Sequence, residues 1–369
     1  MALTQLHIYN VRNLQEIKLQ DLGEINVFSG HNGSGKTSVL EAIHILGLGR
    51  SFRGSSAKAL ITHGKPQCTV FGQGAVSLGV RRLATGESQI KVAGKPASSV
   101  TDLIGYLPLQ VINADSFDLL VGSPRARRQY LDWGVFHVEH RFYPTWRRFQ
   151  RGIKQRNKIL RRDKIVESEL LVWSNDLAEA GDAIHQYREA YFLQLVPRFH
   201  AVLEALAPEL EGLEIRYRRG WDKSLSYAEA LTQSQKSDLE HGYTHVGPQR
   251  GDLRVLINGY SAADTLSRGQ QKLVVCALKL AQGQALEDRR TSQPCSYLVD
   301  DLPSELDSDH CRMVCELLAG MRSQVFITSV QADEIINVWP AGGARPLTMF
   351  HVEHGKITAF TAQADEHEA

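Results

Sequence analysis

Residues 30–37 read GHNGSGKT, and this short stretch decides the fold of the chain. It fits the pattern G-x-x-x-x-G-K-[ST] at every defined position, with Gly30, Gly35, Lys36 and Thr37 in the required places. The segment EINVFSG before it predicts a buried strand, and TSVLEAIHILGLG after it predicts an apolar helix. A strand, a glycine-rich loop and a helix N-terminus form the setting in which this pattern binds phosphate groups.

The loop therefore predicts a nucleotide site with magnesium. The glycines let backbone N–H groups curl around the phosphates, Lys36 reaches the outer phosphates, and the Thr37 hydroxyl binds Mg²⁺. The loop residues that we expect to contact the nucleotide are Gly30, His31, Asn32, Gly33, Ser34, Gly35, Lys36 and Thr37.

The segment YLVDD at 297–301 predicts a buried strand that ends in two carboxylates. Taken alone, it could be a charged turn after a strand. In a chain with a phosphate loop, we expect Asp300 to hold the magnesium through water and Asp301 to orient or deprotonate the attacking water. Many proteins of this type have glutamate at the second position; aspartate is one methylene shorter, so slow hydrolysis is expected.

Residues 264–271 read DTLSRGQQ and allow two interpretations. Ser267 and Gln270 form a capping-box pattern before the apolar-faced helix KLVVCALKLA. The order along the chain adds a second meaning: phosphate loop, insertion, L-S-x-G-Q, then the strand with its carboxylates is the order of an ABC-type ATPase, whose nucleotide is ATP. The second phosphate contact is predicted at Ser267, Arg268, Gly269 and Gln270.

Two such sites in one chain are explained by a head-to-tail homodimer. Within one monomer the second helix N-terminus would face away from the first, whereas in a two-fold dimer each faces the partner's nucleotide. The segment SELD, which ends at Asp307, is expected to form a dimer-contact loop. Thr328, at the end of QVFIT, is expected to sense the γ-phosphate.

Net charge is +1, so any affinity for nucleic acid must come from charge that is segregated along the chain. Between Arg125 and Lys164, thirteen basic residues stand against three acidic ones. A solvated helix face is one interpretation; the interleaved aromatic residues favour a phosphate backbone, with contacts that do not read sequence. The predicted DNA-binding residues are Arg127, Arg128, Arg147, Arg148, Arg151 and Lys154.

Three blocks organise the chain. Segments with strand-like patterns lie on either side of a block with helical patterns. We therefore expect an ABC-type head formed by residues 1–115 and 245–369, and a mainly helical second lobe inserted at residues 116–244. Apolar residues from Leu170 to Tyr191 recur in steps of three and four, which predicts a short antiparallel coiled coil with the helix before Asp163–Ser168. The expected fold class is α/β, with a mixed sheet, helices and an antiparallel β-subdomain in the head.

The cysteine content and the hydropathy of the sequence indicate the cellular location of the protein. Five cysteines are an odd count without a C-x-x-C pair, which favours reduced thiols and a cytoplasmic location; Cys311 and Cys315 are interpreted as buried side chains rather than metal ligands. The first ten residues do not resemble a signal peptide, and no apolar run is long enough to span a membrane.

The sequence resembles the RecF family over nearly its whole length. The resemblance lies in LTQLHIYNVRNL at the start, NGSGKTSVLEAIHILGLGRSFR, GSPRARRQYLDWGVFH, DTLSRGQQKLVVCALKLAQG and YLVDDLPSELD. One departure is Gln249, where relatives often have histidine after Gly-Pro.

The resemblance implies that Arg12 and Asn13 lie close to the nucleotide. It also implies an ATP-dependent dimer on DNA at single-strand gaps, with RecR and RecO as partners that help to load RecA in post-replication repair. The alternative is the ATPase subunit of a membrane transporter, whose corresponding signature usually lies much closer to its phosphate loop. A structural clamp that binds ATP but barely hydrolyses it is a further alternative.

Overall fold

The computed structural model describes residues 2–54, 56–97, 99–287, 293–340 and 345–360. It has two compact units, which we call the head unit (Met1–Ser116 and Lys272–Ala369) and the helical unit (Phe117–Gln271). The sequence-based division placed residues 245–271 in the head, whereas these residues belong to the helical unit. The physical reason is strand pairing, because β10 (Asp252–Ile257) pairs with β9 (Leu213–Arg218).

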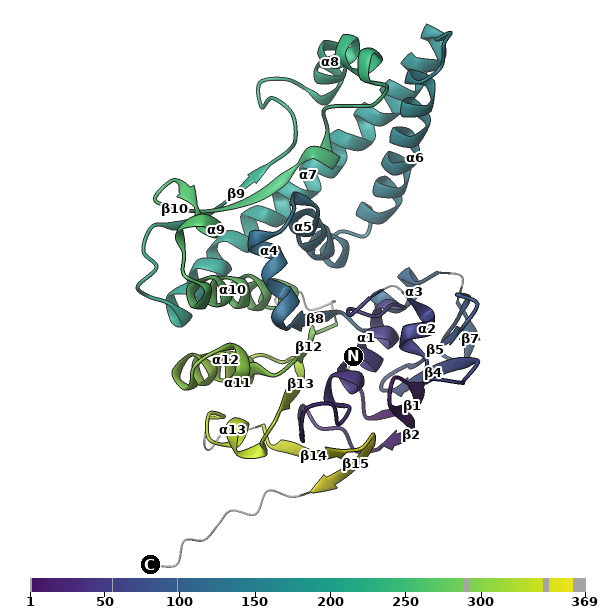
Figure 1. Ribbon diagram of the computed structural model, residues 1–369. Coiled ribbons are helices and arrows are strands. Elements are labelled where there is room, and N and C mark those ends of the chain that lie inside the picture. Colours follow the sequence, from purple (N-terminus) through teal and green to yellow (C-terminus); the bar gives the residue numbers. More distant parts are fainter. Residues whose placement is uncertain (1, 55, 98, 288–292, 341–344, 361–369) are drawn as a thin grey trace, which may run out of the picture. The chain divides into compact units, whose positions relative to one another are not determined.

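Two sheets build the head unit (Figure 1). The mixed sheet has the order β15-β14-β3-β13-β12-β8, in which only the β14–β15 pair is antiparallel. Its strands are β3 (Ile25–Ser29), β8 (Leu109–Ile112), β12 (Ser296–Val299), β13 (Gln324–Ser329), β14 (Leu347–Glu353) and β15 (Lys356–Phe360).

The second sheet is antiparallel, with the order β2-β1-β4-β5-β6-β7. Its strands are β1 (Gln5–Val11), β2 (Leu14–Leu19), β4 (Gln67–Gln73), β5 (Ser77–Leu83), β6 (Ser88–Val92) and β7 (Lys95–Pro96). The head helices are α1 (Lys36–Leu48), α2 (Ala57–Leu60), α3 (Thr101–Ile104), α11 (Leu302–Glu305), α12 (Ser308–Gly320) and α13 (Ala332–Ile336). The 3-10 turn Ala114–Phe117 follows β8, and α10 (Arg268–Glu287) begins in the helical unit and continues into the head.

One hydrophobic core joins the two sheets through α1, which is buried along nearly its whole length. All five residues of β3 are buried, as expected of a central parallel strand. Phe28 of β3 stacks on Phe350 of β14 with 4.9 Å between ring centroids. Because β3, β12 and β13 run parallel, their carboxyl ends meet at one edge of the sheet, where the phosphate loop and the paired carboxylates begin.

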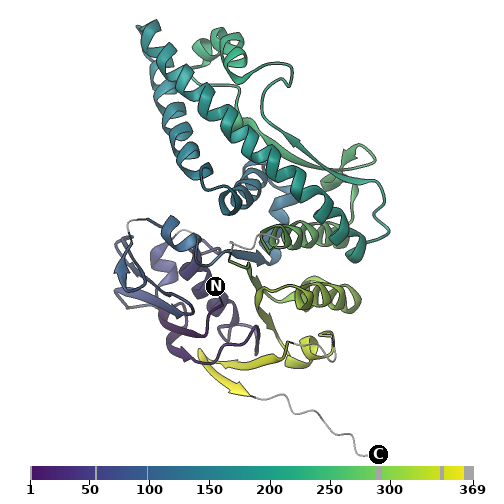
Figure 2. The same ribbon diagram turned by 180° about the vertical axis from the view of Figure 1, so that it is seen from behind.

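The helical unit contains the predicted antiparallel hairpin of α6 (Phe142–Leu160) and α7 (Glu167–Leu206), visible in both ribbon views (Figures 1 and 2). The spacing from Leu170 to Tyr191 is confirmed, because most of its members are buried on one face of α7. The remaining helices are α4 (Asp118–Val121), α5 (Pro124–Val138), α8 (Tyr227–His241), α9 (Ala262–Thr265) and the 3-10 turn Pro248–Arg250.

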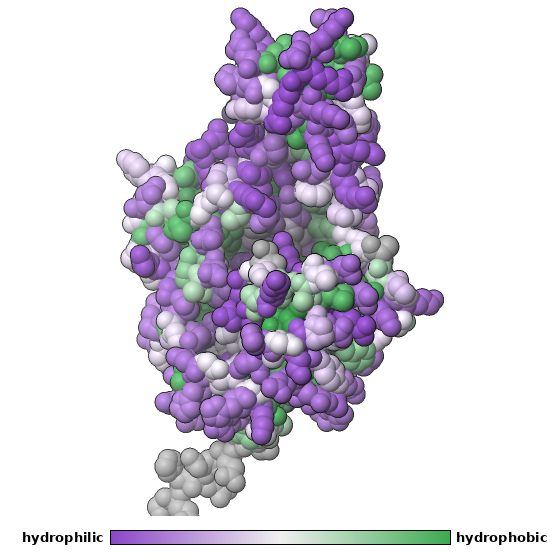
Figure 3. Space-filling view, turned by 45° about the vertical axis from the view of Figure 1, so that its right-hand side comes forward, coloured by the Kyte–Doolittle hydropathy of each residue, from purple (hydrophilic) through white to green (hydrophobic). Residues whose placement is uncertain are grey.

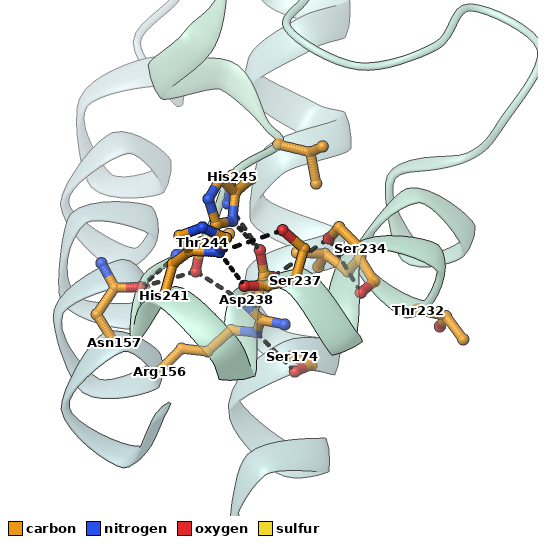
Figure 4. A network of polar contacts seen from close by, with 12 residues as sticks. Arg156, Asn157, Ser174, Thr232, Ser234, Ser237, Asp238, His241, Thr244 and His245 are labelled. Carbon is orange, nitrogen blue, oxygen red and sulfur yellow. Dashed lines mark hydrogen bonds and ion pairs between the residues drawn. The ribbon is translucent and has the colours of Figure 1, made fainter. Parts of the chain in front are cut away.

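A three-stranded antiparallel sheet, β11-β10-β9, completes the helical unit. The turn between β10 and β11 (Tyr260–Ser261) is a two-residue hairpin turn: Asn258 has φ 50° and Gly259 has φ 85°, the positive values that such a turn needs. Arg156 of α6 and Asp238 of α8 form a fully buried ion pair at 2.7 Å, the centre of the polar network in Figure 4. This network ties α6, α7 and α8 together.

The five cysteines are free and buried, and among them Cys311 and Cys315 are buried as predicted. Burial raises the pKa of the Cys276 thiol to about 12, which keeps that group protonated. Hydrophilic residues predominate on the face seen in Figure 3, with hydrophobic residues in small groups. Within the described ranges, none of the helices has the length and apolar character needed to cross a bilayer.

Candidate nucleotide-binding site

The phosphate loop connects β3 to α1 in a conformation that requires glycine. Gly30 has φ 151°, and a Cβ there would lie 2.1 Å from the carbonyl oxygen of Val352. Gly35 has φ 124° and directly precedes the first residue of α1. The unpaired N–H groups of the first turn of α1 are therefore next to the loop, where they can bind an anion.

Lys36 is buried and bound by the loop itself. Its Nζ donates to the carbonyl oxygens of Gly30 at 2.5 Å and His31 at 3.2 Å. Burial lowers the pKa of Lys36, while the nearby Asp301 and Asp300 act in the opposite direction. A lysine held over the loop in this way has its charge next to the position of a bound phosphate.

Asp300 lies at the centre of a chain of hydrogen bonds at the carboxyl ends of β12 and β13. Its Oδ1 accepts from the Thr37 hydroxyl at 2.9 Å and from the Thr328 hydroxyl at 2.8 Å, and Thr328 Oγ1 in turn accepts from the Asp301 N–H at 2.9 Å. Burial raises the pKa of Asp300, although the two hydroxyl donors act against that rise. A hydroxyl and a carboxylate in contact form an all-oxygen donor set, which fits Mg²⁺.

Asp301 has the strained backbone of a functional position. Its φ is 53°, in the left-handed region that aspartate rarely adopts. Oδ2 accepts from the Ser304 hydroxyl at 2.5 Å, whereas Oδ1 is buried and has no hydrogen-bond partner in the described part of the chain. A buried carboxylate oxygen without a donor is costly unless something else binds it, and a water molecule at the γ-phosphate would do so.

A pocket of about 470 Å³ joins these residues. It is lined by Arg12, Asn13, Asn32, Gly33, Gly35, Lys36, Thr37, Ser38, Arg53, Ala114, Asp300, Asp301 and Glu305. Sequence reasoning missed Ser38, Arg53, Ala114 and Glu305 as residues of this site. Arg53 could have been predicted as a site residue, because it follows the end of α1 closely in the sequence. Its half-exposed side chain lines the same pocket as the phosphate loop.

Arg12 and Asn13 line the pocket, but other groups of the protein already bind their side chains. Arg12 makes two hydrogen bonds, of 2.9 and 2.8 Å, to the fully buried carboxylate of Glu41. Asn13 Nδ2 donates to the Ser34 carbonyl at 3.0 Å, and its Oδ1 accepts from the Ser38 hydroxyl at 3.1 Å. Both residues hold the loop and α1 in place; direct contact with a nucleotide stays a prediction.

The N-terminus of α10 contains the predicted capping box. The Gln270 N–H donates to Ser267 Oγ at 3.3 Å, and the Ser267 N–H donates to Gln270 Oε1 at 3.0 Å. Ser267, Arg268 and Gly269 are exposed, and a Cβ at Gly269 would meet no atom within 4 Å. This helix start is therefore open to a ligand from outside the chain.

Asp307 and Thr328 differ in their surroundings. Asp307 is exposed at the N-cap of α12, where it accepts from the N–H of His310 at 3.1 Å and from its ring Nδ1 at 2.6 Å. These bonds lower the pKa of Asp307. Thr328 is fully buried within the hydrogen-bond chain of Asp300 and Asp301, which suits a residue that responds to what occupies the site.

The six predicted DNA-binding residues fall into two groups. Arg127 is paired with Asp252 at 2.8 Å, Arg128 donates to the Gly251 carbonyl at 2.9 Å, and Arg148 bonds to carboxylates of α7. These three have structural partners. The other three, all on α6, are exposed: Arg147, Arg151 and Lys154.

The fold and the site together define the ABC-type P-loop ATPase head with a helical insertion. The family model described as "RecF/RecN/SMC N terminal domain" matches residues 2–358. A solved Smc head, bound to the C-winged helix domain of ScpA, shares the fold with a TM-score of 0.60 at 14% identity, covering 98% of both chains.

Closer relatives specify the family. The chain is 49% identical over 364 residues to the "DNA replication and repair protein RecF" of Pseudomonas syringae pv. syringae (strain B728a), covering 97% of this chain and 98% of that one. A solved structure of the recombination mediator protein RecF-ATPrS in the RecFOR pathway superposes with a TM-score of 0.83 at 27% identity, covering 98% of both chains. The chain belongs to the RecF family, as the sequence predicted.

Proposed function

We propose that this protein is an ATP-dependent DNA-binding protein of recombinational repair and replication-fork maintenance, which acts in the cytoplasm. The observation that carries the proposal is the linked set Thr37, Asp300, Thr328 and Asp301 beside the phosphate loop. In this arrangement Thr37 and Asp300 would hold Mg²⁺, which would supply positive charge beside the outer phosphates. A solved relative described as RecF-ATPrS supports ATP as the nucleotide.

Hydrolysis is assigned to Asp301. Its unpartnered Oδ1 can take a proton from water, while the Ser304 hydroxyl holds the other carboxylate oxygen. The Lys36 charge stabilises the negative charge that develops on the transferred phosphoryl group. The short aspartate side chain supports weak turnover, and we propose that DNA stimulates it.

The second phosphate contact belongs to a dimer. All residues that line the pocket belong to the head unit, whereas Ser267, Arg268 and Gly269 are exposed at a helix start in the helical unit. In a head-to-tail homodimer, Ser267 and the N–H groups of this turn would bind the partner's γ-phosphate. ATP would then form part of the dimer interface, and hydrolysis would weaken it.

DNA at single-strand gaps is the proposed substrate of the dimer. The exposed cations of α6 support contacts to the backbone rather than to bases. The relatives are named as DNA replication and repair proteins, and the RecFOR pathway supports RecR and RecO as partners in loading RecA. A transporter subunit, the alternative, is not favoured by this family.

The deciding experiment measures binding to gapped, single-stranded and duplex DNA with and without ATP, while size-exclusion chromatography follows the dimer. We expect ATP to produce the dimer and to raise affinity for gapped DNA. Binding that ignores ATP, or a protein that stays monomeric with ATP, would contradict the proposal.

A further inference from the structure

The helical unit contains an open cleft of about 1160 Å³ that the nucleotide site does not use. It lies at the end of β9, beside the segment that follows this strand and the turn Pro248–Arg250. Five of its lining residues are basic: Arg218, Arg219, Lys223, Arg250 and Arg254. The lining acids are fewer, namely Glu189, Asp222 and Asp252.

Two of the three acids of the cleft already bind groups other than its exposed arginines. Asp252 is bound by Arg127 at 2.8 Å, and Asp222 accepts from the N–H and hydroxyl of Ser224. Arg218 and Arg254 are exposed, and neither has an ion pair or side-chain hydrogen bond within the described residues. Their charges are therefore available to a ligand.

Strand register places like charges opposite each other. Arg254 of β10 lies directly opposite Arg216 of β9 on the exposed face of the sheet. Glu214 pairs with Arg216 at 2.5 Å, which leaves Arg254 unneutralised. Like charges directly opposite in an antiparallel pair are destabilising, and a bound anion would remove that cost.

The cleft also has a buried donor without an acceptor. Arg219 Nε is buried and has no hydrogen-bond partner in the described part of the chain, while its Nη2 donates to the Leu225 carbonyl at 2.7 Å. The Arg219 guanidinium also lies 4.7 Å from the centroid of the Trp221 ring. The Tyr227 ring lies 4.8 Å from the Trp221 ring between centroids, so two side chains of the protein already contact Trp221.

Buried hydrogen bonds hold the turn that carries Arg250. The fully buried Arg188 donates to the Pro248 carbonyl at 2.8 Å, and Arg128 donates to the Gly251 carbonyl at 2.9 Å. Burial, and the nearby charges of Arg188 and Arg250, lower the pKa of Arg128, which shows how closely the cations are placed.

The network of Figure 4 fixes the chain just before this turn. Asp238 accepts from the N–H of His245 at 2.9 Å and from Arg156 at 2.7 Å, and Asn157 accepts from the N–H of Thr244 at 2.9 Å. The cations of the cleft are thus presented by a preorganised frame, which lowers the entropic cost of binding.

We propose that this cleft binds phosphate groups of a nucleic-acid backbone, independently of sequence. The inference rests on the DNA-binding function proposed above and adds a contact surface distinct from the exposed cations of α6. Nucleic acid fits better than a single small anion, because the open cleft of about 1160 Å³ is lined by five basic residues, among them the exposed Arg218 and Arg254. Arginine and lysine side chains of this kind bind phosphate oxygens, and such contacts position a protein on the backbone without reading the bases.

The test uses the full-length protein with ATP and fluorescent gapped DNA, titrated by anisotropy over a range of salt concentrations. The variant Arg218→Gln/Arg254→Gln removes two unpaired, exposed charges. We expect the slope of log affinity against log salt to fall by about 1 to 2, since each phosphate contact contributes about 0.9. The matched control Lys236→Gln/Lys356→Gln removes two exposed charges elsewhere and should keep the wild-type slope.

Each outcome has a separate meaning. If wild-type protein shows no ATP-dependent DNA binding, the proposed function fails. If wild-type protein binds but the Arg218/Arg254 variant keeps its full salt slope, only the cleft assignment fails. A second arm uses fluorescent polyglutamate: if the variant loses polyglutamate binding and keeps the DNA slope, the cleft is a docking site for an acidic protein and the proposal is overturned.

Discussion

The N-termini of α1 and α10 are two helix starts that sequence assigns to phosphate, and they are built in opposite ways. At α1, Lys36 is buried, and Thr37 of the same helix donates to Asp300, which lies 263 residues further along the chain. At α10, Ser267 is exposed, and its hydrogen bonds in the described part of the chain are made with Gln270 and Gln271 of the same helix start. A site assembled from distant segments can bind a ligand within one chain, whereas an exposed cap needs a second surface to enclose the ligand.

The largest expected effect comes from Asp301→Asn. The amide removes the base but keeps the size of the side chain, so ATP hydrolysis should fall about a thousandfold, within the range of general-base contributions. ATP binding should persist, and ATP-bound dimers should accumulate in size-exclusion chromatography. The control Ser304→Ala removes only the donor to Oδ2 and should cost much less. Wild-type turnover in Asp301→Asn would show that another group acts as the base.

Ser267→Arg tests the α10 side of the comparison, with Ser226→Arg as its matched control. Both serines are exposed capping-box residues of the helical unit, so each substitution costs about 1 kcal/mol of cap stability. Only Ser267→Arg should abolish the ATP-dependent dimer and reduce hydrolysis about a hundredfold, the loss typical of one phosphate-stabilising donor. ATP binding by the monomer, measured by calorimetry, should be unchanged.

If both serine variants lost the dimer to the same extent, the cap rather than a phosphate contact would explain the effect. If neither did, the α10 start would have no role between subunits. The comparison of the two helix starts would then concern helix capping alone.

Asn13→Ala tests how much the long-range support of the α1 site matters. Asn13 links the loop carbonyl of Ser34 to the Ser38 hydroxyl of α1. Each hydrogen bond lost costs about 1 kcal/mol, so affinity for ATP should fall about tenfold. Thr62→Val, which removes one hydrogen bond to the Arg12 carbonyl away from the loop, should leave the affinity close to wild type. Unchanged affinity in Asn13→Ala would mean that the glycines and α1 hold the loop without this link.

Local patterns predicted both helix starts, the buried strands and the α6–α7 hairpin, because each is set by residues close together in the chain. These patterns could not predict the contacts between side chains that are far apart in the sequence. The ion pairs Arg127–Asp252 and Arg12–Glu41 produce no periodic pattern in the sequence. The unit boundary at Gln271 was missed for the same reason, since it depends on strand pairing between distant segments.

Asp300→Asn should give the smallest effect, which is a change in melting temperature. The direction of this change shows whether Asp300 matters more for ligand binding or for the stability of the fold. Burial raises the pKa of Asp300 above its ordinary value of 3.8, so the folded chain holds this proton more tightly than the unfolded chain. The free energy of unfolding therefore decreases as pH rises from about 3.8 through the folded pKa, and at neutral pH the buried charge is a net cost. Asparagine keeps an acceptor for Thr37 and Thr328 without the charge.

Without nucleotide, Asp300→Asn should therefore raise the melting temperature at neutral pH by roughly 1–3 °C, and the gain should vanish at acid pH. With Mg²⁺ and ATP the order should reverse, because the wild type gains stability from the bound ion and the variant does not. Differential scanning fluorimetry at two pH values, with and without Mg²⁺ and ATP, measures all of these shifts. A variant that is stabilised by Mg²⁺ and ATP as strongly as the wild type would remove Asp300 from the magnesium site, and α1 would then bind its ligand through the loop alone.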